Sequence, residues 1–270
     1  MPRPQAAPRI TLTDIDRLYR SGEKLVMLTC YDASFAVLAE EAGVELLLVG
    51  DSLGMVIQGH PTTLPVTLDD IAYHTRAVAR TAQRALVIAD MPFGSYQGTA
   101  ETAFANAATL MAAVAHMVKL EGGRLMHPTV RYLVDRGIPV CGHIGLTPQS
   151  VHQLGGFRVQ GRAEDAANVL RDEARLLQEA GAALIVLEAM PAALAGTITA
   201  ELHTPTIGIG AGPDCSGQVL VLYDALGIYP GRKARFVRDF MAGSTSIAEA
   251  LGTYVQDVKA GKFPAAEHCF

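Results

Sequence analysis

The sequence predicts an α/β protein, a (β/α)8 TIM barrel with an N-terminal helix and a C-terminal helical extension. Short apolar runs alternate with helical segments at spacings of about 20 to 45 residues, which is the pattern of parallel βαβ units. Eight candidate strands favour a closed barrel over an open sheet, and 270 residues suit one barrel domain. We therefore expect a single domain over residues 1–270, with residues 1–23 as the N-terminal helical segment and residues 230–270 as the extension.

The first predicted element, residues 11–19, is a short amphipathic helix suited to closing the bottom of a barrel. Ile15 and Leu18 lie on its apolar face. Gly43 ends the next predicted helix, and Thr67 with Asp70 forms a capping box at the start of another. The predicted strands of this half are residues 24–30, 45–50, 85–90 and 117–121, and its other helices are residues 34–42, 67–83 and 101–116.

In the second half of the chain, residues 219–223 are the best candidate for an eighth strand. Residues 146–162 are a long connection between a strand and a helix, so they form either a lid or an exposed loop. Residues 208–212 are rich in glycine and either resemble a phosphate-binding loop or let the chain pass close to a ligand or the rim. The other predicted strands are residues 138–143, 183–188 and 205–209, and the predicted helices are residues 129–136, 163–180, 191–202 and 247–259.

The composition excludes several classes of function. With 18% charged residues, a net charge of −5 and no basic block, the chain is a poor binder of nucleic acid or anionic membrane. Its apolar runs are shorter than the roughly 20 residues that span a bilayer, and residues 1–10 lack the apolar core of a signal peptide. The 4 cysteines form no CxxC pair, so we expect free thiols in a reducing cytoplasm rather than a zinc site. Small molecules remain as the expected partners.

Five apolar runs in this chain lead into a residue that can bind metal or move a proton. In a parallel barrel the carboxyl ends of all strands meet at one rim, where enzymes of this fold place their chemistry. Five such endings in register with the βα repeat predict an active site around a divalent cation. The residues are Asp51, Asp90, Glu121, His143 and Glu188, and Ser52 and Lys119 lie beside two of them.

Asp51 and Asp90 are the strongest metal candidates, because each follows an entirely apolar strand and is expected at the mouth of a dry barrel. Two adjacent carboxylates repel each other unless a cation lies between them. Mg²⁺ suits such a site, since it binds through one or two carboxylates and keeps positions for water and substrate oxygens. The alternative for either residue is a cap on the following helix.

Ser52, Lys119 and Glu121 are candidates for holding an anionic substrate beside the metal. The hydroxyl and backbone N–H of Ser52 suit a carboxylate, although serine also caps helices. Lys119 and Glu121 share one face of a strand, so Lys119 can neutralise a substrate carboxylate and Glu121 can reach the metal directly or through water. The alternative is a structural ion pair, either between these two residues or with a neighbouring strand.

His143 and Glu188 are the candidates for proton transfer. His143 either donates a hydrogen bond to the substrate, orients a metal-bound water or has a structural role. Glu188 follows the apolar run Leu184–Leu187, where desolvation favours the protonated carboxyl group and suits a general base. The alternative for Glu188 is a buried carboxylate that is satisfied by backbone N–H groups.

At these residues the chain resembles the ketopantoate hydroxymethyltransferase (3-methyl-2-oxobutanoate hydroxymethyltransferase) family. The matching stretches follow one another from about residue 25 to residue 229 and are highly specific when taken together. They include Val-Gly-Asp-Ser-Leu-Gly-Met at residues 49–55, Met-Val-Lys-Leu-Glu-Gly-Gly at residues 117–123, Gly-His-Ile-Gly-Leu-Thr-Pro-Gln-Ser at residues 142–150 and Gly-Ile-Gly-Ala-Gly at residues 208–212.

The resemblance implies how the acidic residues are used. Mg²⁺, held by Asp51 and Asp90 with Glu121 nearby, is expected to bind the oxo and carboxylate oxygens of 3-methyl-2-oxobutanoate. Ser52 and Lys119 are then expected to hold the carboxylate of the same substrate. These roles come from the family, whereas the residues themselves indicate only a metal, an oxo-acid type of ligand and a carboxylate base.

The resemblance also implies the reaction. Glu188 removes the proton from C3 of the substrate, His143 contacts the substrate, and the enolate attacks the one-carbon unit of 5,10-methylenetetrahydrofolate. The product is ketopantoate, the precursor of pantothenate and coenzyme A. Members of the family are cytoplasmic homo-oligomers, commonly decamers, so we expect the same assembly here.

Two rival functions remain open on the sequence alone. The related isocitrate lyase and phosphoenolpyruvate mutase group also uses a magnesium site on a similar barrel. Its lyases need a Lys-Lys-Cys-Gly-His loop, whereas Cys141-Gly142-His143 here follows Pro139-Val140 at the end of a predicted strand. A non-catalytic metabolite-binding barrel is the third reading, and Glu188 with the complete set of acids argues against it.

Overall fold

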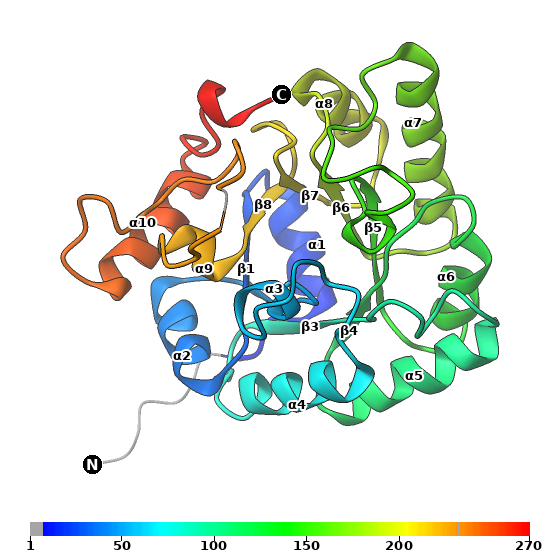
Figure 1. The fold of residues 1–270 in the computed structure, drawn as a ribbon, viewed down its shortest axis with the longest axis horizontal. Coiled ribbons are helices and arrows are strands. Elements are labelled where there is room, and N and C mark those ends of the chain that lie inside the picture. The colour runs from blue at the N-terminus through cyan, green and yellow to red at the C-terminus, as the bar shows by residue number, and fades with distance from the viewer. Residues whose placement is uncertain (1–7, 232) are drawn as a thin grey trace.

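Eight parallel strands close into a barrel in the computed structural model, which describes residues 8–231 and 233–270. Each strand pairs with its neighbours in chain order, and β8 pairs with β1 (Figure 1). The predicted (β/α)8 fold is therefore confirmed. The strands are β1 (Leu25–Thr29), β2 (Leu46–Val49), β3 (Leu86–Asp90), β4 (Met117–Lys119), β5 (Val140–Gly145), β6 (Leu184–Glu188), β7 (Thr206–Ile209) and β8 (Gly217–Leu220).

Most of the helices form an outer ring around the strands, whereas α1 lies across one end of the barrel (Figure 1). Their inward faces carry small and branched apolar side chains, which pack on the outer face of the barrel in one continuous core. The helices are α1 (Leu12–Arg20), α2 (Ala33–Ala42), α3 (Leu53–Val56), α4 (Leu68–Ala79), α5 (Ala100–Ala112), α6 (His127–Val134), α7 (Glu164–Glu179), α8 (Ala192–Glu201), α9 (Leu222–Ala225) and α10 (Ile247–Lys259), with two short 3₁₀ turns at Pro148–Ser150 and Ala266–His268.

Local sequence signals account for several helix ends. The Thr67 hydroxyl accepts a hydrogen bond from the backbone N–H of Asp70, and the Asp70 carboxylate accepts one from the backbone N–H of Thr67, so the predicted capping box is present. Gly43 ends α2 with φ of 101°, a left-handed conformation that glycine adopts without steric cost. The helix after the capping box ends at Ala79, earlier than the predicted residue 83.

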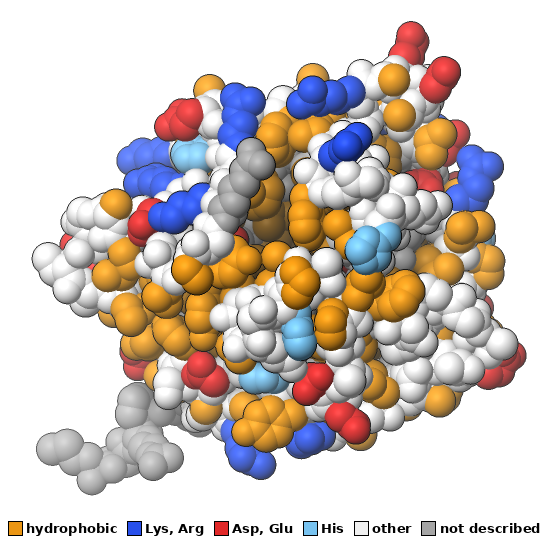
Figure 2. Space-filling model, viewed as in Figure 1, with side chains coloured by type: hydrophobic (Ala, Val, Ile, Leu, Met, Phe, Trp, Pro, Cys, Tyr) orange, Lys and Arg blue, Asp and Glu red, His pale blue; other side chains and the backbone are white. Residues whose placement is uncertain are grey.

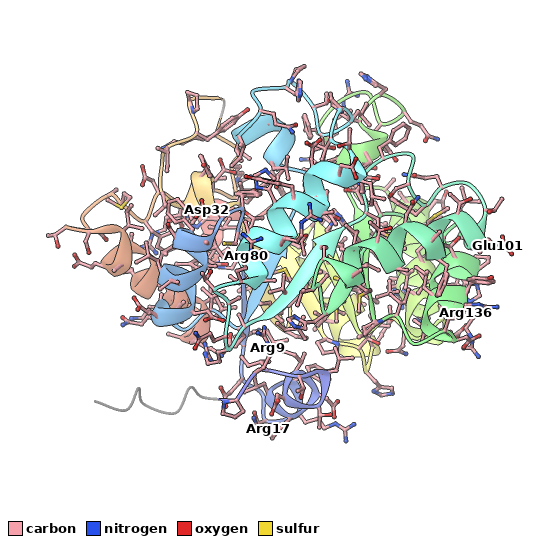
Figure 3. The ribbon with its side chains drawn as sticks, turned by 90° about the horizontal axis from the view of Figure 1, so that it is seen from below. Arg9, Arg17, Asp32, Arg80, Glu101 and Arg136 are labelled. Atoms are coloured by element: carbon pink, nitrogen blue, oxygen red, sulfur yellow. The ribbon has the colours of Figure 1, made fainter. Side chains whose placement is uncertain are left out.

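Helix α1 covers the amino-terminal end of the barrel, as the sequence predicts. Its Ile15 is only 2% exposed and joins the apolar cluster that fills the interior, together with Leu25, Leu46 and Leu86. Figure 3 shows α1, with Arg17 on it, beneath the strands at one end of the molecule. This end is closed by hydrophobic packing, so a ligand has to enter from the other end.

The eighth strand is displaced from its prediction. It runs from Gly217 to Leu220, and residues 222–225 form the short helix α9. Gly217 pairs with Leu25 on one side and Ile207 on the other, and a Cβ atom here would lie 2.4 Å from the Leu25 carbonyl oxygen. The close approach of three strands requires glycine, a residue that strand patterns normally exclude.

Helix α10 packs on the barrel of its own chain. Tyr254 is fully buried, and its hydroxyl donates a hydrogen bond to the Met27 carbonyl oxygen at 2.8 Å. Because α10 is used within the chain, it gives no support to the expected oligomer. Within the described residues no helix is long and apolar enough to span a membrane. The sequence also predicts that residues 1–10 lack the apolar core of a signal peptide, and residues 1–7 of this segment lie outside the described part of the chain.

Candidate active site

A cavity of about 640 Å³ opens at the carboxyl-terminal end of the barrel. Figure 2 shows the hollow in this face, bordered by hydrophobic side chains and with Lys and Arg side chains gathered above and to its left. Strand ends form its floor, and residues 157–159 and 233–236 line its outer part. The structure brings all seven sequence-predicted site residues to this cavity: Asp51, Ser52, Asp90, Lys119, Glu121, His143 and Glu188.

Asp51 and Asp90 lie side by side on the floor, 4% and 2% exposed. Oδ2 of Asp90 accepts a hydrogen bond from the backbone N–H of Asp51 at 3.1 Å, and its Oδ1 accepts one from Nζ of Lys119 at 2.6 Å. Neither carboxylate caps a helix, since the N-caps of α3 and α5 are Ser52 and Thr99. The alternative of two helix caps is therefore wrong.

The electrostatics of the floor favour binding of a cation. Burial, followed by the neighbouring Asp90 carboxylate, raises the pKa of Asp51 to about 7, although Lys119 opposes the shift. Burial likewise raises the pKa of Glu121 well above its ordinary value. Although burial alone would lower the pKa of Lys119, the carboxylates around it raise that pKa, so its amine stays charged. One lysine cannot neutralise three buried acids, and a divalent ion would complete the balance.

Lys119 forms an ion pair with Asp90 on the neighbouring strand β3. This is one of the two structural ion pairs that the sequence left open for Lys119. The amine has three N–H donors, so this pair leaves donors for a ligand in the cavity. The backbone register places Lys119 directly beside Asp90, and strand alternation explains why Lys119 and Glu121 both reach the interior. β4 itself ends at Lys119, so Glu121 lies just beyond the strand.

Ser52 is held by a tyrosine that the sequence interpretation did not include. Its Oγ lies 2.9 Å from the hydroxyl of Tyr31, which is 1% exposed at the end of β1. Ser52 is the first residue before α3, yet its side chain makes no cap hydrogen bond. The hydroxyl is therefore directed by Tyr31 toward the cavity side rather than used for the helix.

His143 lies between two carboxylates. Its Nε2 is 3.2 Å from Oε2 of Glu188, and its Nδ1 is 3.6 Å from Oε1 of Glu121. Burial, with the charge of Lys119, lowers the pKa of His143, so the ring is neutral near pH 7. The residue sits within β5, which continues to Gly145, rather than at its predicted end.

Glu188 ends β6 and is the most accessible of the four predicted acids. Its side chain is 14% exposed, against 3% for Glu121 and Asp90, so the strongest desolvation falls on the other acids. Among the described residues no backbone N–H donates to its carboxylate, and its near neighbour is the His143 ring. The alternative of a carboxylate satisfied by backbone groups is not supported, and the side chain is free to act on a ligand.

The donor set fits a hydrated divalent ion better than a closed metal centre. Within residues 8–231 and 233–270, no three His, Cys, Asp or Glu side chains form a ready-made metal cluster. Oγ1 of Thr63 and both ring nitrogens of His143 line this cavity region as buried polar atoms without aligned protein partners. Such atoms require a partner, which a ligand or its water can supply. The carboxylates of Asp51 and Asp90 leave room for these extra ligands.

Two other sequence features have structural rather than catalytic settings. A Cβ atom at Gly210 would lie 2.6 Å from the ring of Phe236, so this glycine lets the chain pass close to the rim, the second of the two readings for residues 208–212. The Cys141 thiol is fully buried, burial raises its pKa to about 12, and it does not line the cavity. This thiol lacks the exposure that the lyase acid requires.

Several residues in or directly behind the cavity were not predicted from the sequence. Gln149 and Tyr96 lie behind the acids, and Arg158, Arg235 and Phe236 line the outer part. The first two lie in loops without a periodic pattern, and nothing in their spacing indicates that they meet. Only the stretch of residues 142–150, which carries part of the family resemblance, pointed to Gln149 at all.

The chain is similar in sequence to known proteins. The family model described as Ketopantoate hydroxymethyltransferase matches residues 9–266. The chain is 62% identical over 262 residues to the 3-methyl-2-oxobutanoate hydroxymethyltransferase of Azoarcus sp. (strain BH72), covering 97% of each chain. It is 61% identical over 265 residues to the protein of the same name from Dechloromonas aromatica (strain RCB), covering 98% of this chain and 97% of the relative.

Solved structures with low sequence identity share the fold. Phosphonopyruvate hydrolase, crystallised in a complex with oxalate and Mg²⁺, superposes with a TM-score of 0.62 at 15% identity, covering 94% of this chain and 99% of its own. Phosphoenolpyruvate phosphomutase from Streptomyces platensis subsp. rosaceus gives a TM-score of 0.59 at 14% identity, covering 79% and 82%. By its sequence over nearly the full length, the chain belongs to the ketopantoate hydroxymethyltransferase family.

Proposed function

We propose that this chain transfers a hydroxymethyl group from 5,10-methylenetetrahydrofolate to 3-methyl-2-oxobutanoate, giving ketopantoate for pantothenate and coenzyme A biosynthesis. Membership of the family supports the reaction and the acceptor. The observation that carries the residue assignment is the position of Glu188, the most accessible of the four predicted acids, in the same cavity as the buried pair of Asp51 and Asp90. The buried pair suits charge binding, and the accessible acid suits proton transfer.

Asp51 and Asp90 are the proposed metal ligands, with Glu121 close enough to act directly or through water. When bound, Mg²⁺ supplies Lewis-acid stabilisation of negative charge on the oxo oxygen of the substrate. The protein supports this arrangement through Lys119, whose Nζ donates a hydrogen bond to Oδ1 of Asp90 at 2.6 Å. The raised pKa of Asp51 means that the site itself favours a positively charged occupant.

Ser52 and Lys119 are proposed to hold the carboxylate of the ketoacid. Tyr31 fixes the Ser52 hydroxyl, and the charged amine of Lys119 keeps N–H donors for the substrate in addition to the one that contacts Asp90. Both residues lie on the acidic side of the cavity, whereas Val186, Ile209 and Val219 line another part of the floor. These apolar side chains suit the isopropyl group of the substrate.

Glu188 is the proposed base. Its carboxylate takes the proton from C3, and the electron pair of that C–H bond forms the enolate double bond while charge moves onto the oxo oxygen. The neutral His143 ring lies beside this carboxylate, with Nε2 3.2 Å from Oε2, and is placed to contact the substrate. Water hydrolyses the methylene group of the folate to formaldehyde, which breaks both of its C–N bonds and releases tetrahydrofolate. C3 then attacks the carbonyl carbon of this formaldehyde, and the resulting alkoxide takes up the proton that Glu188 removed, which gives the hydroxymethyl group.

The outer part of the cavity has the size and chemistry for the folate. A ketoacid of eight non-hydrogen atoms fills at most roughly 240 Å³, if each atom takes the ~30 Å³ of a liquid water, which leaves more than half of the space. Phe236 and Phe270 lie edge to face there, and Phe157 is 53% exposed at the mouth. Arg158 and Arg235 line this part of the cavity and can take the anionic tail of the carrier.

The direct test is product formation. We expect purified protein with Mg²⁺, 3-methyl-2-oxobutanoate and 5,10-methylenetetrahydrofolate to form ketopantoate, detected by mass spectrometry, and EDTA to stop it. Absence of product with every divalent ion tried would refute the proposal. Cleavage of 2-methylisocitrate would instead favour the lyase reading, and binding of the ketoacid without any reaction would favour a binding protein.

We further propose a cytoplasmic homo-oligomer, with a decamer as the expected count. The support is the family resemblance alone, because the terminal helix α10 is occupied by its own barrel through Tyr254. Sedimentation of the full chain at several concentrations tests the count, and a monomer at all of them would refute it.

A further inference from the structure

Gln149 is a buried polar side chain in a loop that carries no proposed catalytic group. It is 4% exposed and belongs to the 3₁₀ turn Pro148–Ser150, at the start of the long connection 146–162. Its Nε2 donates hydrogen bonds to Oδ2 of Asp51 at 2.9 Å and to the Met91 carbonyl oxygen at 3.0 Å. Its backbone N–H donates to Oε2 of Glu121 at 3.0 Å. One residue therefore contacts two of the acids of the site.

The orientation of this amide is fixed by chemistry. Oε1 of Gln149 accepts hydrogen bonds from the Tyr96 hydroxyl at 2.7 Å and from Nε2 of Gln97 at 3.1 Å. If the amide were rotated by half a turn, its oxygen would face the Met91 carbonyl oxygen, which only accepts, and its N–H donor to that oxygen would be lost. All four hydrogen-bonding positions of the side chain are therefore used in the one arrangement that satisfies them.

Tyr96 extends the network to the backbone of Glu121, just beyond the end of β4. It is 1% exposed, and its hydroxyl accepts a hydrogen bond from the backbone N–H of Glu121 at 3.0 Å while it donates to Gln149. The connections after β2, β3, β4 and β5 are thus linked through one amide and one phenol. Such fully satisfied buried networks specify geometry, and a partly broken one is costly.

The rest of connection 146–162 has the character of a lid. Its tip is exposed, and Gly155 and Gly156 have φ of 68° and 110°, which lets the chain reverse there. Phe157, Arg158 and Val159 then return to line the cavity. Gln149 is the anchored end of a segment whose other end covers the ligand space.

We propose that Gln149 is a positioning residue: it fixes Asp51 and Glu121 relative to each other and couples the order of connection 146–162 to the acid site. The inference rests on the function proposed above only for the identity of the ligand. It adds a physical consequence, that loss of the amide loosens the lid and weakens cation binding together.

Three variants test the proposal in the full chain. Gln149→Met keeps the side-chain length and removes its four hydrogen bonds, and Tyr96→Phe removes only the hydroxyl. Gln160→Met is the matched control, because Gln160 lies in the same connection and its side chain bonds only the Arg158 carbonyl oxygen. The first readout is hydrogen–deuterium exchange of residues 146–162 without ligand, and the second is Mn²⁺ affinity by electron paramagnetic resonance with the metal alone.

We expect Gln149→Met to speed exchange of the connection and to weaken Mn²⁺ binding by about tenfold each, since several hydrogen bonds are lost at once. Tyr96→Phe is expected to speed exchange about threefold and to weaken Mn²⁺ binding about threefold. The effect of the double variant should be smaller than the product of the two single effects, because the phenol and the amide act as a unit. Gln160→Met should stay within about twofold of wild type.

Two outcomes would overturn the proposal. If Gln149→Met matched Gln160→Met in both readouts, Gln149 would position nothing. If exchange rose while Mn²⁺ affinity held, it would be a loop anchor only. Should Gln149→Met fail to fold, Tyr96→Phe carries the same test with a single oxygen removed. Failure of ketopantoate formation would refute the proposed function without affecting these results, since neither readout uses the reaction.

Discussion

The two ends of this barrel are built from the same strands but from opposite kinds of side chain. At the amino-terminal end, Ile15 of α1 packs against Leu25 and Leu46, and the interior is dry and closed. At the carboxyl-terminal end, acids, a lysine and a histidine surround an open cavity. The comparison teaches that stability and chemistry are separated along the strand direction, as expected for enzymes of this fold.

The separation also explains why the charged end is tolerated. Its buried acids would be costly without partners, and they are compensated locally by Lys119, by the Gln149 amide and by a proposed cation. The apolar end supplies the packing that holds these groups in place. Substitutions at the two ends should therefore affect different measurements. Four predictions, given from the largest expected effect to the smallest, would break or sharpen this comparison.

The largest expected effect is that of Glu188→Gln at the open end. The amide cannot take a proton, so exchange of the C3 proton of 3-methyl-2-oxobutanoate in D₂O should fall about 10³-fold, a typical loss for a general base. Binding of Mg²⁺ and the ketoacid should persist. Glu101→Gln, an exposed acid of α5 labelled in Figure 3, is the control and should exchange normally. Retained exchange in Glu188→Gln would move the base role to His143.

Next in size is the loss of charge at the metal ligands. Asp51→Asn and Asp90→Asn keep the shape of the side chains but remove a negative charge, so we expect Mg²⁺ affinity to fall by about 100-fold in each, measured by calorimetry. Asp69→Ala, at an exposed position of α4, provides the control. Unchanged affinity in both Asn variants would remove these residues from the metal site.

A smaller effect is expected from pH. The pKa of Asp51 is raised to about 7, first by burial and then by Asp90, with Lys119 opposing. Because the folded protein binds this proton more tightly than the unfolded chain, the contribution to stability is present below about pH 4 and is lost as the pH rises through about 7. Mg²⁺ must displace the same proton, so its affinity should rise about tenfold from pH 6 to pH 8. Equal affinities at the two pH values would contradict the assignment.

The smallest effect on the reaction is expected at the closed end. Ile15→Ala leaves a cavity under the barrel and should lower the free energy of unfolding by about 2–5 kcal/mol in urea titrations. Product formation below the unfolding transition should stay within about twofold of wild type. Leu12→Ala, on the same helix and 37% exposed, should change stability little. A matching loss of activity in Ile15→Ala would show that the two ends are not separate.

The sequence predicted the barrel and its acids well because both follow from short-range patterns. Apolar runs that end in Asp51, Asp90 or Glu188 mark buried strands and their carboxyl ends, and parallel closure then gathers those residues without further information. The weak eighth strand was misplaced because Gly217 is required by its close approach to Leu25 of β1, which is distant in sequence.

The remaining parts of the site depend on contacts that no local pattern records. Gln149 reaches Asp51 across 98 residues of chain, and its meeting with Tyr96 depends on the paths of two irregular loops. The Tyr31 contact with Ser52 joins the ends of two strands that only the barrel places together. Gln149 was visible in the sequence only as part of a stretch that resembles the family, and nothing in the sequence pointed to Tyr96.

The most direct test of the central claim is proton NMR of 3-methyl-2-oxobutanoate in D₂O with the wild-type protein and no folate. The account predicts loss of the C3 proton signal with Mg²⁺, and none with EDTA, because the open end forms the enolate before the one-carbon unit is needed. A C3 signal that persists with Mg²⁺, or an exchange rate that EDTA leaves unchanged, would contradict it.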